Sequence, residues 1–416
     1  MKAVVAATLA AGLALAWPHA SEAAGKKVDP QEAARIHERL LVLDTHLDTP
    51  ANFARPGWSI LDDHSHERDL SQVDLPRMRK GGLDGGFWVI YTGQGERTPE
   101  GNRRARDHGL KRLVEIREMV AAHPQHFELA LSADDAVRIA AAGKRVVFIS
   151  MENASPLASD PTLLTAYHAL GLRMLGITHI GNNDFGDSAN SAPEWNGLSP
   201  AGKALVAEAN RLGIVLDASH ASDLVFDQLL ELSRAPIVLS HTSSDAVYEH
   251  PRNIDDERIR RLAAKGGVIH VNAYPGYLIP REESPERKRA MDELEARFGD
   301  YEKLPPEQVA AYLRERDAID ARYPLAQATF EDYMRHLLHI LEVAGPEHVG
   351  IGADWDGGGG VQGLEDVSAL PRITQALLEA GYSEQDLANI WGGNILRVLR
   401  QAEQVAAQMA EEAAGG

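Results

Sequence analysis

Eight short apolar runs constrain the fold of this chain more than any other feature. They are continuous rather than alternating and end at or beside polar residues, as expected for strands buried on both faces of a parallel sheet. The runs occupy residues 40–43, 86–91, 146–150, 173–177, 214–217, 237–240, 268–271 and 349–353. We therefore expect a parallel sheet at the centre of the molecule.

Helical patterns separate most of these runs. Ser199 and Pro200 supply a capping residue and a first-turn proline for a helix that ends near Leu212. Other helical segments are expected at residues 104–122, 223–233, 255–265 and 329–344. Strands that alternate with helices in this way predict the α/β class and a (β/α)8 TIM-like barrel. A doubly wound open sheet is the alternative, but eight roughly equal repeats favour closure.

The first 24 residues differ from the rest of the chain. Lys2 precedes an unbroken apolar run over residues 3–17, and the small residues Ser21 and Ala23 follow at the spacing that signal peptidases recognise. This pattern predicts a signal peptide over residues 1–24, with an uncleaved anchor as the alternative. The run is too short for a typical membrane span. We expect a secreted protein, in the bacterial periplasm, that has no membrane anchor after cleavage.

No linker and no internal repeat divides residues 25–416, so we expect one barrel domain there. Residues 282–323, between the seventh and eighth runs, are charged, helical and rich in Glu and Arg. They are predicted to form a helical insertion on the surface, either a lid or subunit contact or a plain solvated hairpin. The four glycines at 357–360 lack the lysine and the spacing of a phosphate-binding loop.

Composition narrows the chemistry that the chain can perform. Its 416 residues include no cysteine, which excludes disulfides, thiolate metal sites and cysteine nucleophiles. Its formal net charge is -19, and no run of Lys and Arg stands out. A nucleic-acid partner is not expected, because binding to phosphates requires a basic surface. Any metal must be held by histidines and carboxylates.

Residues that can bind metal ions follow most of the predicted strands. Active sites of such barrels lie at the carboxyl ends of the strands, so these side chains are expected to converge. Singly, each has an ordinary explanation: a polar turn, a helix cap or a buried, hydrogen-bonded histidine. Their common position at strand ends makes a shared site the better interpretation. The residues are His46, Asp48, Glu152, His179, His220, His241 and Asp354.

Three histidines and two carboxylates form a ligand set that suits zinc. The predicted metal ligands are His46, Asp48, Glu152, His220 and His241. Two ions need a bridging carboxylate, and Glu152 follows a middle strand between the two ligand groups. Ions roughly 3.5–4 Å apart can share a hydroxide, which becomes a nucleophile near neutral pH and can attack an amide.

Three residues are candidates for catalysis and substrate binding. Asp354 is predicted to take a proton from water and pass it to the leaving amine; a metal ligand or a structural acid is the alternative. His179 is expected to donate a hydrogen bond to the developing oxyanion. Arg252 is expected to bind a substrate carboxylate at two points. Without this context, an ordinary surface ion pair would be the favoured explanation of Arg252.

Short motifs over most of the chain point to one known family. They are Asp44-Thr45-His46-Leu47-Asp48, Gly85-Gly86-Phe87-Trp88, Met151-Glu152-Asn153, Gly176-Ile177-Thr178-His179, Asn210-Arg211-Leu212-Gly213 with Ser219-His220, Ser233-Arg234-Ala235-Pro236 with Ser240-His241-Thr242-Ser243, Arg252-Asn253, Gly350-Ile351-Gly352-Ala353-Asp354-Trp355-Asp356-Gly357 and Gly392-Gly393-Asn394. Together they resemble the membrane (renal-type) dipeptidases, metallopeptidase family M19. The resemblance extends from about residue 40 to residue 399 and is highly specific.

The resemblance implies a dizinc barrel that cleaves dipeptides and often tolerates a D-residue at the carboxyl side. His46 and Asp48 would hold one zinc ion, and His220 and His241 the other. Glu152 would bridge the two ions. The family commonly forms homodimers, so a homodimer is also implied.

The resemblance further implies that His179, Arg252 and Asp354 bind substrate and assist catalysis, and that Tyr277 lines the substrate site. Some features depart from the family pattern. Asn153 and Ala154 replace the familiar glycines after the bridging glutamate, and the segment 282–323 is longer than in mammalian members. The cysteines and lipid-anchor signal of those members are absent. These departures concern substrate preference and dimer geometry rather than the metal ligands.

Two other functions compete with a dipeptidase. Another amide hydrolase on the same barrel, such as one for N-acyl amino acids, would also use Arg252 because its substrate carries a free carboxylate. A periplasmic carrier of a metal or ligand would not need Asp354, and it would show two lobes and a hinge, for which the sequence gives no sign.

Overall fold

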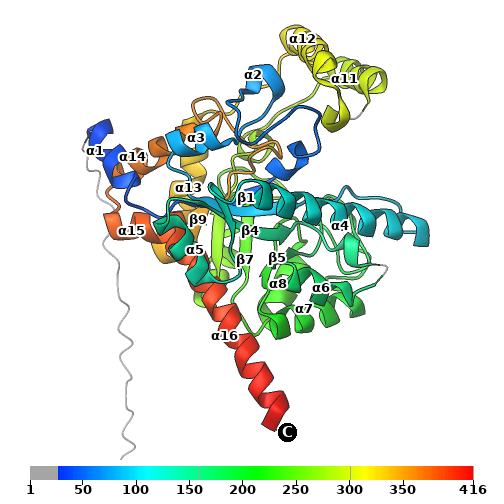
Figure 1. The fold of residues 1–416 in the computed structure, drawn as a ribbon, viewed down its shortest axis with the longest axis vertical. Coiled ribbons are helices and arrows are strands. Elements are labelled where there is room, and N and C mark those ends of the chain that lie inside the picture. The colour runs from blue at the N-terminus through cyan, green and yellow to red at the C-terminus, as the bar shows by residue number, and fades with distance from the viewer. Residues whose placement is uncertain (1–26, 159, 300, 416) are drawn as a thin grey trace, which may run out of the picture.

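A parallel sheet closed almost into a barrel forms the centre of the molecule (Figure 1). The computed structural model describes residues 27–158, 160–299 and 301–415; the predicted signal peptide, residues 1–24, lies outside them. Neighbouring strands follow the order β1-β2-β4-β5-β6-β7-β8-β9, and β3 pairs only with β4. The strands are β1 Leu43–Leu47, β2 Gly85–Ile90, β3 Phe127–Leu129, β4 Arg145–Met151, β5 Leu172–Gly176, β6 Val215–Asp217, β7 Val238–Thr242, β8 Val268–Val271 and β9 Val349–Ile351.

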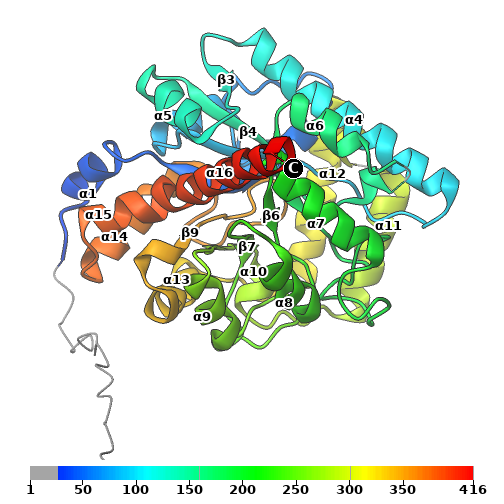
Figure 2. The same ribbon diagram turned by 90° about the horizontal axis from the view of Figure 1, so that it is seen from below.

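The first and last strands of this order lie side by side. A parallel bridge joins Leu47 to Trp355, and the amide of Asp48 donates a hydrogen bond of 2.9 Å to the carbonyl of Trp355. Helices surround the sheet (Figures 1 and 2). The expected (β/α)8 TIM-like barrel is therefore confirmed, with β3 as an extra strand outside the eight.

The main helices begin and end where local signals place them. Ser199 caps α7 (Pro200–Leu212) by accepting from the amide of Gly202, and Gly213 ends it with a φ of 74°. Thr329 and Asp332 form a capping box at the start of α13. The helices are α1 Pro30–His37, α2 His66–Asp69, α3 Leu75–Lys80, α4 Pro99–Ala122, α5 Ala133–Ala141, α6 Leu163–Ala169, α7, α8 Asp223–Leu232, α9 Asp256–Ala264, α10 Pro275–Leu278, α11 Pro285–Phe298, α12 Pro306–Arg322, α13 Phe330–Ala344, α14 Pro371–Glu379, α15 Glu384–Ala388 and α16 Asn394–Gly415.

The last helix, α16, lies across the amino-terminal end of the barrel (Figure 2). Arg397 donates to the carbonyl of Gly266, just before β8, and an apolar cluster joins Ile395 and Leu399 to strand residues such as Phe148. This end is filled with side chains, and active sites of such barrels form at the opposite, carboxyl-terminal end. None of the helices described here is long and apolar enough to span a bilayer.

Residues 282–323 contain α11 and α12, which stand together beyond the carboxyl-terminal end (Figure 1). They have a small apolar core of their own: Leu294, Leu304, Val309, Tyr312 and Leu313. Tyr301, between the two helices, donates a hydrogen bond of 2.5 Å to the carbonyl of Asp69, and the guanidinium of Arg55 lies over its ring. The pair of helices therefore packs on the loop that follows β1.

The first strand differs from the sequence prediction. A strand was expected at residues 40–43, but β1 extends through the polar residues up to Leu47. The side chains of Asp44 and Thr45 are tolerated inside the barrel because they form hydrogen bonds there. Asp44 accepts from the amides of His46 and Ala353, and Thr45 donates to the carbonyl of Ser240. The short strand β3 was not expected from the sequence.

Candidate metal centre and active site

The predicted site residues come from six strands and meet at the carboxyl-terminal end of the barrel. His46 lies within β1 and His241 within β7, while the others follow the ends of β1, β4, β5, β6 and β9 by a few residues at most. All are buried except His179, whose side chain is 16% exposed. The residues are His46, Asp48, Glu152, His179, His220, His241 and Asp354.

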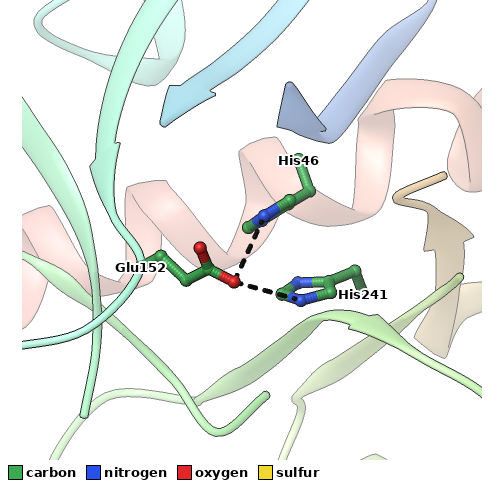
Figure 3. Close-up of side chains that lie close together, drawn as sticks. All are labelled: His46, Glu152 and His241. Atoms are coloured by element: carbon green, nitrogen blue, oxygen red, sulfur yellow. Dashed lines mark ion pairs between the residues drawn. The ribbon is translucent and has the colours of Figure 1, made fainter. Parts of the chain in front are cut away.

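One oxygen of Glu152 is the point on which the imidazoles converge. Glu152 Oε1 lies 3.1 Å from His220 Nε2 and 3.6 Å from the Nε2 atoms of His46, His179 and His241. Figure 3 shows this oxygen between the rings of His46 and His241, which enter from two different strands. A single carboxylate surrounded by four imidazole nitrogens is the geometry expected of a metal-binding cluster.

Two groups of short contacts lie beside Glu152. In one group, His220 Nε2 and His241 Nε2 are 2.9 Å apart. In the other, His46 Nε2 lies 3.2 Å from Asp48 Oδ2, and Asp354 offers an oxygen within 4.8 Å of both residues. Contacts also join the two groups, because the ring centres of His46 and His241 lie 3.7 Å apart, and the expected assignment of the ligands to two ions stays a prediction.

The donor set fits metal cations. His46 Nε2 and Asp48 Oδ1 are buried, and neither has a hydrogen-bond partner among the described residues. Burial lowers the pKa of His46, but Asp48 and Glu152 outweigh this and raise it to about 10. The carboxylates around His46 therefore favour a positive charge at this point, which a bound metal cation would supply. Burial lowers the pKa of His220 and the pKa of His241 well below the usual histidine value. Both rings are therefore neutral, as metal ligands must be.

A hydrogen-bonded chain orients His241. Ser240 Oγ donates to Asp217 Oδ2 over 2.5 Å and lies 2.8 Å from His241 Nδ1. Because the serine hydroxyl gives its proton to Asp217, it accepts one from His241 Nδ1. The lone pair of Nε2 then points at the site, which is the usual arrangement behind a metal-bound imidazole. Asp217 also accepts from the amides of Ser219 and Ser240, which holds it in place.

Arg252 is a buried cation beside the metal cluster. Its Nη1 and Nη2 atoms donate to Thr242 Oγ1 and to the carbonyl of His241, both over 2.8 Å. Arg252 is buried and held by these hydrogen bonds, and not by the surface ion pair considered from the sequence. Its guanidinium lies 5.5 Å from the centre of the Tyr277 ring, in α10. An unpaired buried guanidinium next to an aromatic ring is suited to an anionic substrate group.

His179 and Asp354 occupy opposite sides of the cluster. Burial, and secondarily Arg252, lowers the pKa of His179 to about 4, so the ring is neutral. Its ring lies 4.3 Å from that of His220 and 5.1 Å from that of Tyr91. Asp354 follows β9 and has a φ of 65°, and Asn272 donates a hydrogen bond to it. The distance of His179 from Glu152 equals that of His46, so distance alone does not separate a ligand from a hydrogen-bond donor.

Four polar residues around the site were not found from the sequence as functional. They are Asp44, Gln72, Asn272 and Asp356. Asp356 stands in the motif Asp354-Trp355-Asp356-Gly357 and could have been noticed there. Gln72 lies in an unremarkable stretch before α3, and no local pattern distinguishes it.

Comparison with known proteins gives a consistent result. Residues 30–413 match the family model for membrane dipeptidase, peptidase family M19. Dipeptidase tcpJ of Claviceps purpurea is 31% identical over 347 residues, which cover 82% of this chain and 72% of that protein. A probable dipeptidase, PvdM from Pseudomonas aeruginosa, superposes with a TM-score of 0.76 at 32% identity and covers 91% of this chain and 99% of its own.

A second solved structure is relevant to the site. It is a metallo peptidase from Rhodobacter sphaeroides, liganded with a phosphinate mimic of the dipeptide L-Ala-D-Ala. It shares 25% identity and a TM-score of 0.67 with this chain, covering 87% of this chain and 99% of its own. From the family match, these relatives and the buried cluster of imidazoles and carboxylates, we conclude that the protein belongs to the membrane dipeptidase family, peptidase family M19.

Proposed function

We propose that this protein hydrolyses the peptide bond of dipeptides with a water molecule activated by two zinc ions. The observation that carries the proposal is the convergence of four imidazole nitrogens on Glu152 Oε1, within 3.1 to 3.6 Å, at the carboxyl-terminal end of the barrel. Family membership makes the chain a metal-dependent dipeptidase; the identity and number of the ions are the finer part of the proposal.

His46 and Asp48 would hold one ion, and His220 and His241 the other. Glu152 would bridge them, since it is the one carboxylate in reach of both groups. Histidine nitrogens and carboxylate oxygens without thiolates are compatible with zinc, and geometry rather than affinity alone selects the metal. When bound, the ions would lower the pKa of water and polarise the scissile carbonyl.

The side chains of the protein perform the remaining steps. Asp354 accepts the proton of the attacking water and transfers it to the leaving amine. His179 donates a hydrogen bond to the carbonyl oxygen as negative charge develops on it. Arg252 binds the free carboxylate of the substrate and Tyr277 flanks it, which orients the peptide bond over the cluster. The carboxylate requirement restricts cleavage to short substrates whose carboxyl end reaches Arg252.

Three further proposals concern the setting of the enzyme. The apolar run at residues 3–17 supports export to the bacterial periplasm and removal of residues 1–24. The ligand of the Rhodobacter sphaeroides relative supports acceptance of a D-residue at the carboxyl side. Family resemblance supports a homodimer, which light scattering of the purified protein would test.

Metal analysis combined with a substrate panel tests the function. The protein purified without chelator should contain two zinc ions per chain and cleave L,L and L,D dipeptides, and removal of metal should abolish cleavage until zinc is restored. N-acyl amino acids provide the matched comparison, because they carry the same carboxylate but no free amine. Cleavage of N-acyl amino acids alone would overturn the assignment to dipeptides.

A further inference from the structure

The loop after β9, residues 354–360, has a backbone conformation that is unfavourable at two of its residues. Asp354 and Asp356 both have left-handed φ angles, 65° and 63°, which residues with a side chain adopt at a cost in energy. The four glycines that follow Asp356 add conformational freedom. A Cβ at Gly357 would collide with the carboxylates of Asp48 and Asp354, so this glycine cannot be replaced by a stiffer residue.

Gln72, which precedes α3, holds this loop from outside. Its side-chain Nε2 donates to the carbonyls of Gly359 and Glu365 over 2.7 and 2.9 Å, and its Oε1 accepts from the amide of Asp356 over 2.7 Å. Its own amide donates to Asp356 Oδ1 over 2.7 Å, and its carbonyl accepts from the amide of Val367. Each polar group of this buried residue therefore bonds to the segment 356–367.

Asp356 connects the same loop to the first metal-ligand segment. Its Oδ2 accepts from the hydroxyl of Thr49 over 2.7 Å, and Thr49 directly follows Asp48. The amide of Asp48 in turn donates to the carbonyl of Trp355. Asp354 and Asp48 are thus fixed relative to each other through Asp356 on one side and Trp355 on the other.

We propose that Gln72 and Asp356 are positioning residues, which hold the backbone of loop 354–360 so that the carboxylate of Asp354 faces the metal cluster. Neither touches the imidazoles of the cluster: Gln72 acts through Asp356 and the glycine backbone, and Asp356 acts through Thr49 and Gln72. The inference rests on the proposed role of Asp354 in proton transfer.

Gln72→Ala is the primary test. Loss of three side-chain hydrogen bonds frees the loop, and misplacement of Asp354 by about 1 Å should lower kcat by about 100-fold. KM and zinc content should stay near those of the wild type, because Arg252 and the five ligands are not bonded to Gln72. The matched control is Gln228→Ala. Gln228 also holds a loop at the same barrel end, because its side chain hydrogen-bonds to the backbone of Leu198 and Asn196. It has no hydrogen bond to the described segment 354–360. The kcat of the Gln228→Ala variant should therefore be unchanged.

Two further variants separate positioning from general loss of structure. Asp356→Asn keeps an oxygen for the amide of Gln72 and a partner for the hydroxyl of Thr49, so it should retain more of kcat than Asp356→Ala. In an Asp354→Asn background, Gln72→Ala should cause no further loss in the residual rate, since the group it positions is already inactive. Full additivity of the two losses would overturn the proposal.

Amide exchange gives a readout that does not depend on activity. Exchange at residues 356–360, followed by mass spectrometry on the zinc-loaded protein, should be faster in Gln72→Ala than in the wild type and unchanged in Gln228→Ala. Unchanged exchange in Gln72→Ala, or wild-type kcat with normal zinc content, would reject the positioning role while leaving the dipeptidase assignment intact. A wild-type protein that cleaves no dipeptide would instead reject the proposed function, and exchange would still decide whether Gln72 holds the loop.

Discussion

The two ends of the barrel bury opposite kinds of side chain, apolar at one end and charged or polar at the other. At the amino-terminal end, strand residues such as Leu43 and Val268 meet Ile395 and Leu399 of α16 in a fully apolar cluster. At the carboxyl-terminal end, three carboxylates, three imidazoles and one guanidinium are buried, and the partly exposed imidazole of His179 lies beside them. The first end stabilises the fold by burial of apolar surface, whereas the second places charges where desolvation opposes folding.

In this fold, the residues that stabilise the protein and the residues of the active site thus lie at opposite ends of the barrel. The buried charges at the carboxyl-terminal end are tolerated for two reasons. Hydrogen bonds hold the backbone there, as those accepted by Asp44 and donated by Gln72 do. Metal ions can also compensate the charge. Substitutions at the two ends should therefore have opposite effects: loss of activity without loss of stability at one, and the reverse at the other.

Glu152→Gln should have the largest effect on activity. It removes the charge that both ligand groups share, so metal content should fall and kcat/KM should drop by more than about 1,000-fold. The free energy of unfolding of the metal-free protein should not decrease, because a buried carboxylate has been replaced by a neutral group of similar size. Zinc analysis, dipeptide kinetics and urea unfolding after chelation measure these three quantities. A marked loss of stability in the metal-free variant would break the comparison.

Asp354→Asn should abolish turnover while both metal ions remain bound. Loss of a group that transfers protons costs about 10²–10⁴-fold in rate. Dipeptide kinetics and zinc analysis measure the turnover and the metal content of this variant. Wild-type rates in this variant would refute the role of Asp354 in proton transfer.

Leu399→Ala should show the opposite behaviour at the other end. Leu399 is fully buried in α16, and its truncation should reduce the free energy of unfolding by about 2–5 kcal/mol. The kcat of the folded fraction should not change, because the metal cluster lies at the far end of the strands. Leu232→Ala is the control, since that leucine is 44% exposed and should alter stability little. Denaturant unfolding and kinetics at low temperature provide the measurements.

A smaller effect concerns acid stability and a histidine outside the metal cluster, His37. Burial lowers the pKa of His37 to about 4, and its ring lies between Thr374 and the carbonyl of Gly81. The unfolded chain binds a proton at this histidine near its ordinary pKa of 6.5, whereas the folded protein does not until about pH 4. This contribution to stability is therefore complete above pH 6.5 and is lost as the pH falls towards 4, by about 3 kcal/mol in total.

His37→Gln tests this assignment, because glutamine can hydrogen-bond to the same partners without titrating. Urea unfolding between pH 7 and pH 4 should show a smaller loss of stability in the variant than in the wild type. Identical pH dependence in the two proteins would contradict it. Burial also lowers the pKa of His336 to about 4. His336 should therefore account for part of the pH dependence of stability that remains in the His37→Gln variant.

The sequence predicted the repeating architecture because its signals are local. Seven of the eight apolar runs coincide closely with strands, and the cap at Ser199 and the helix after it were located correctly. The first strand was displaced because Asp44, Thr45 and His46 look like a polar turn. Only the surrounding strands, through Ser240 and Ala353, supply the partners that let these polar residues continue a buried strand.

The sequence by itself determined which residue types stand at the ends of the strands, and therefore that His46, Glu152 and His241 would face one end of a barrel. This follows from the parallel arrangement, in which every strand end of one kind lies on the same side. Only the tertiary structure decided the distances among these side chains and the part played by Gln72. Its partners lie more than 280 residues away along the chain, and hydrogen bonds between such distant segments leave no local pattern in the sequence.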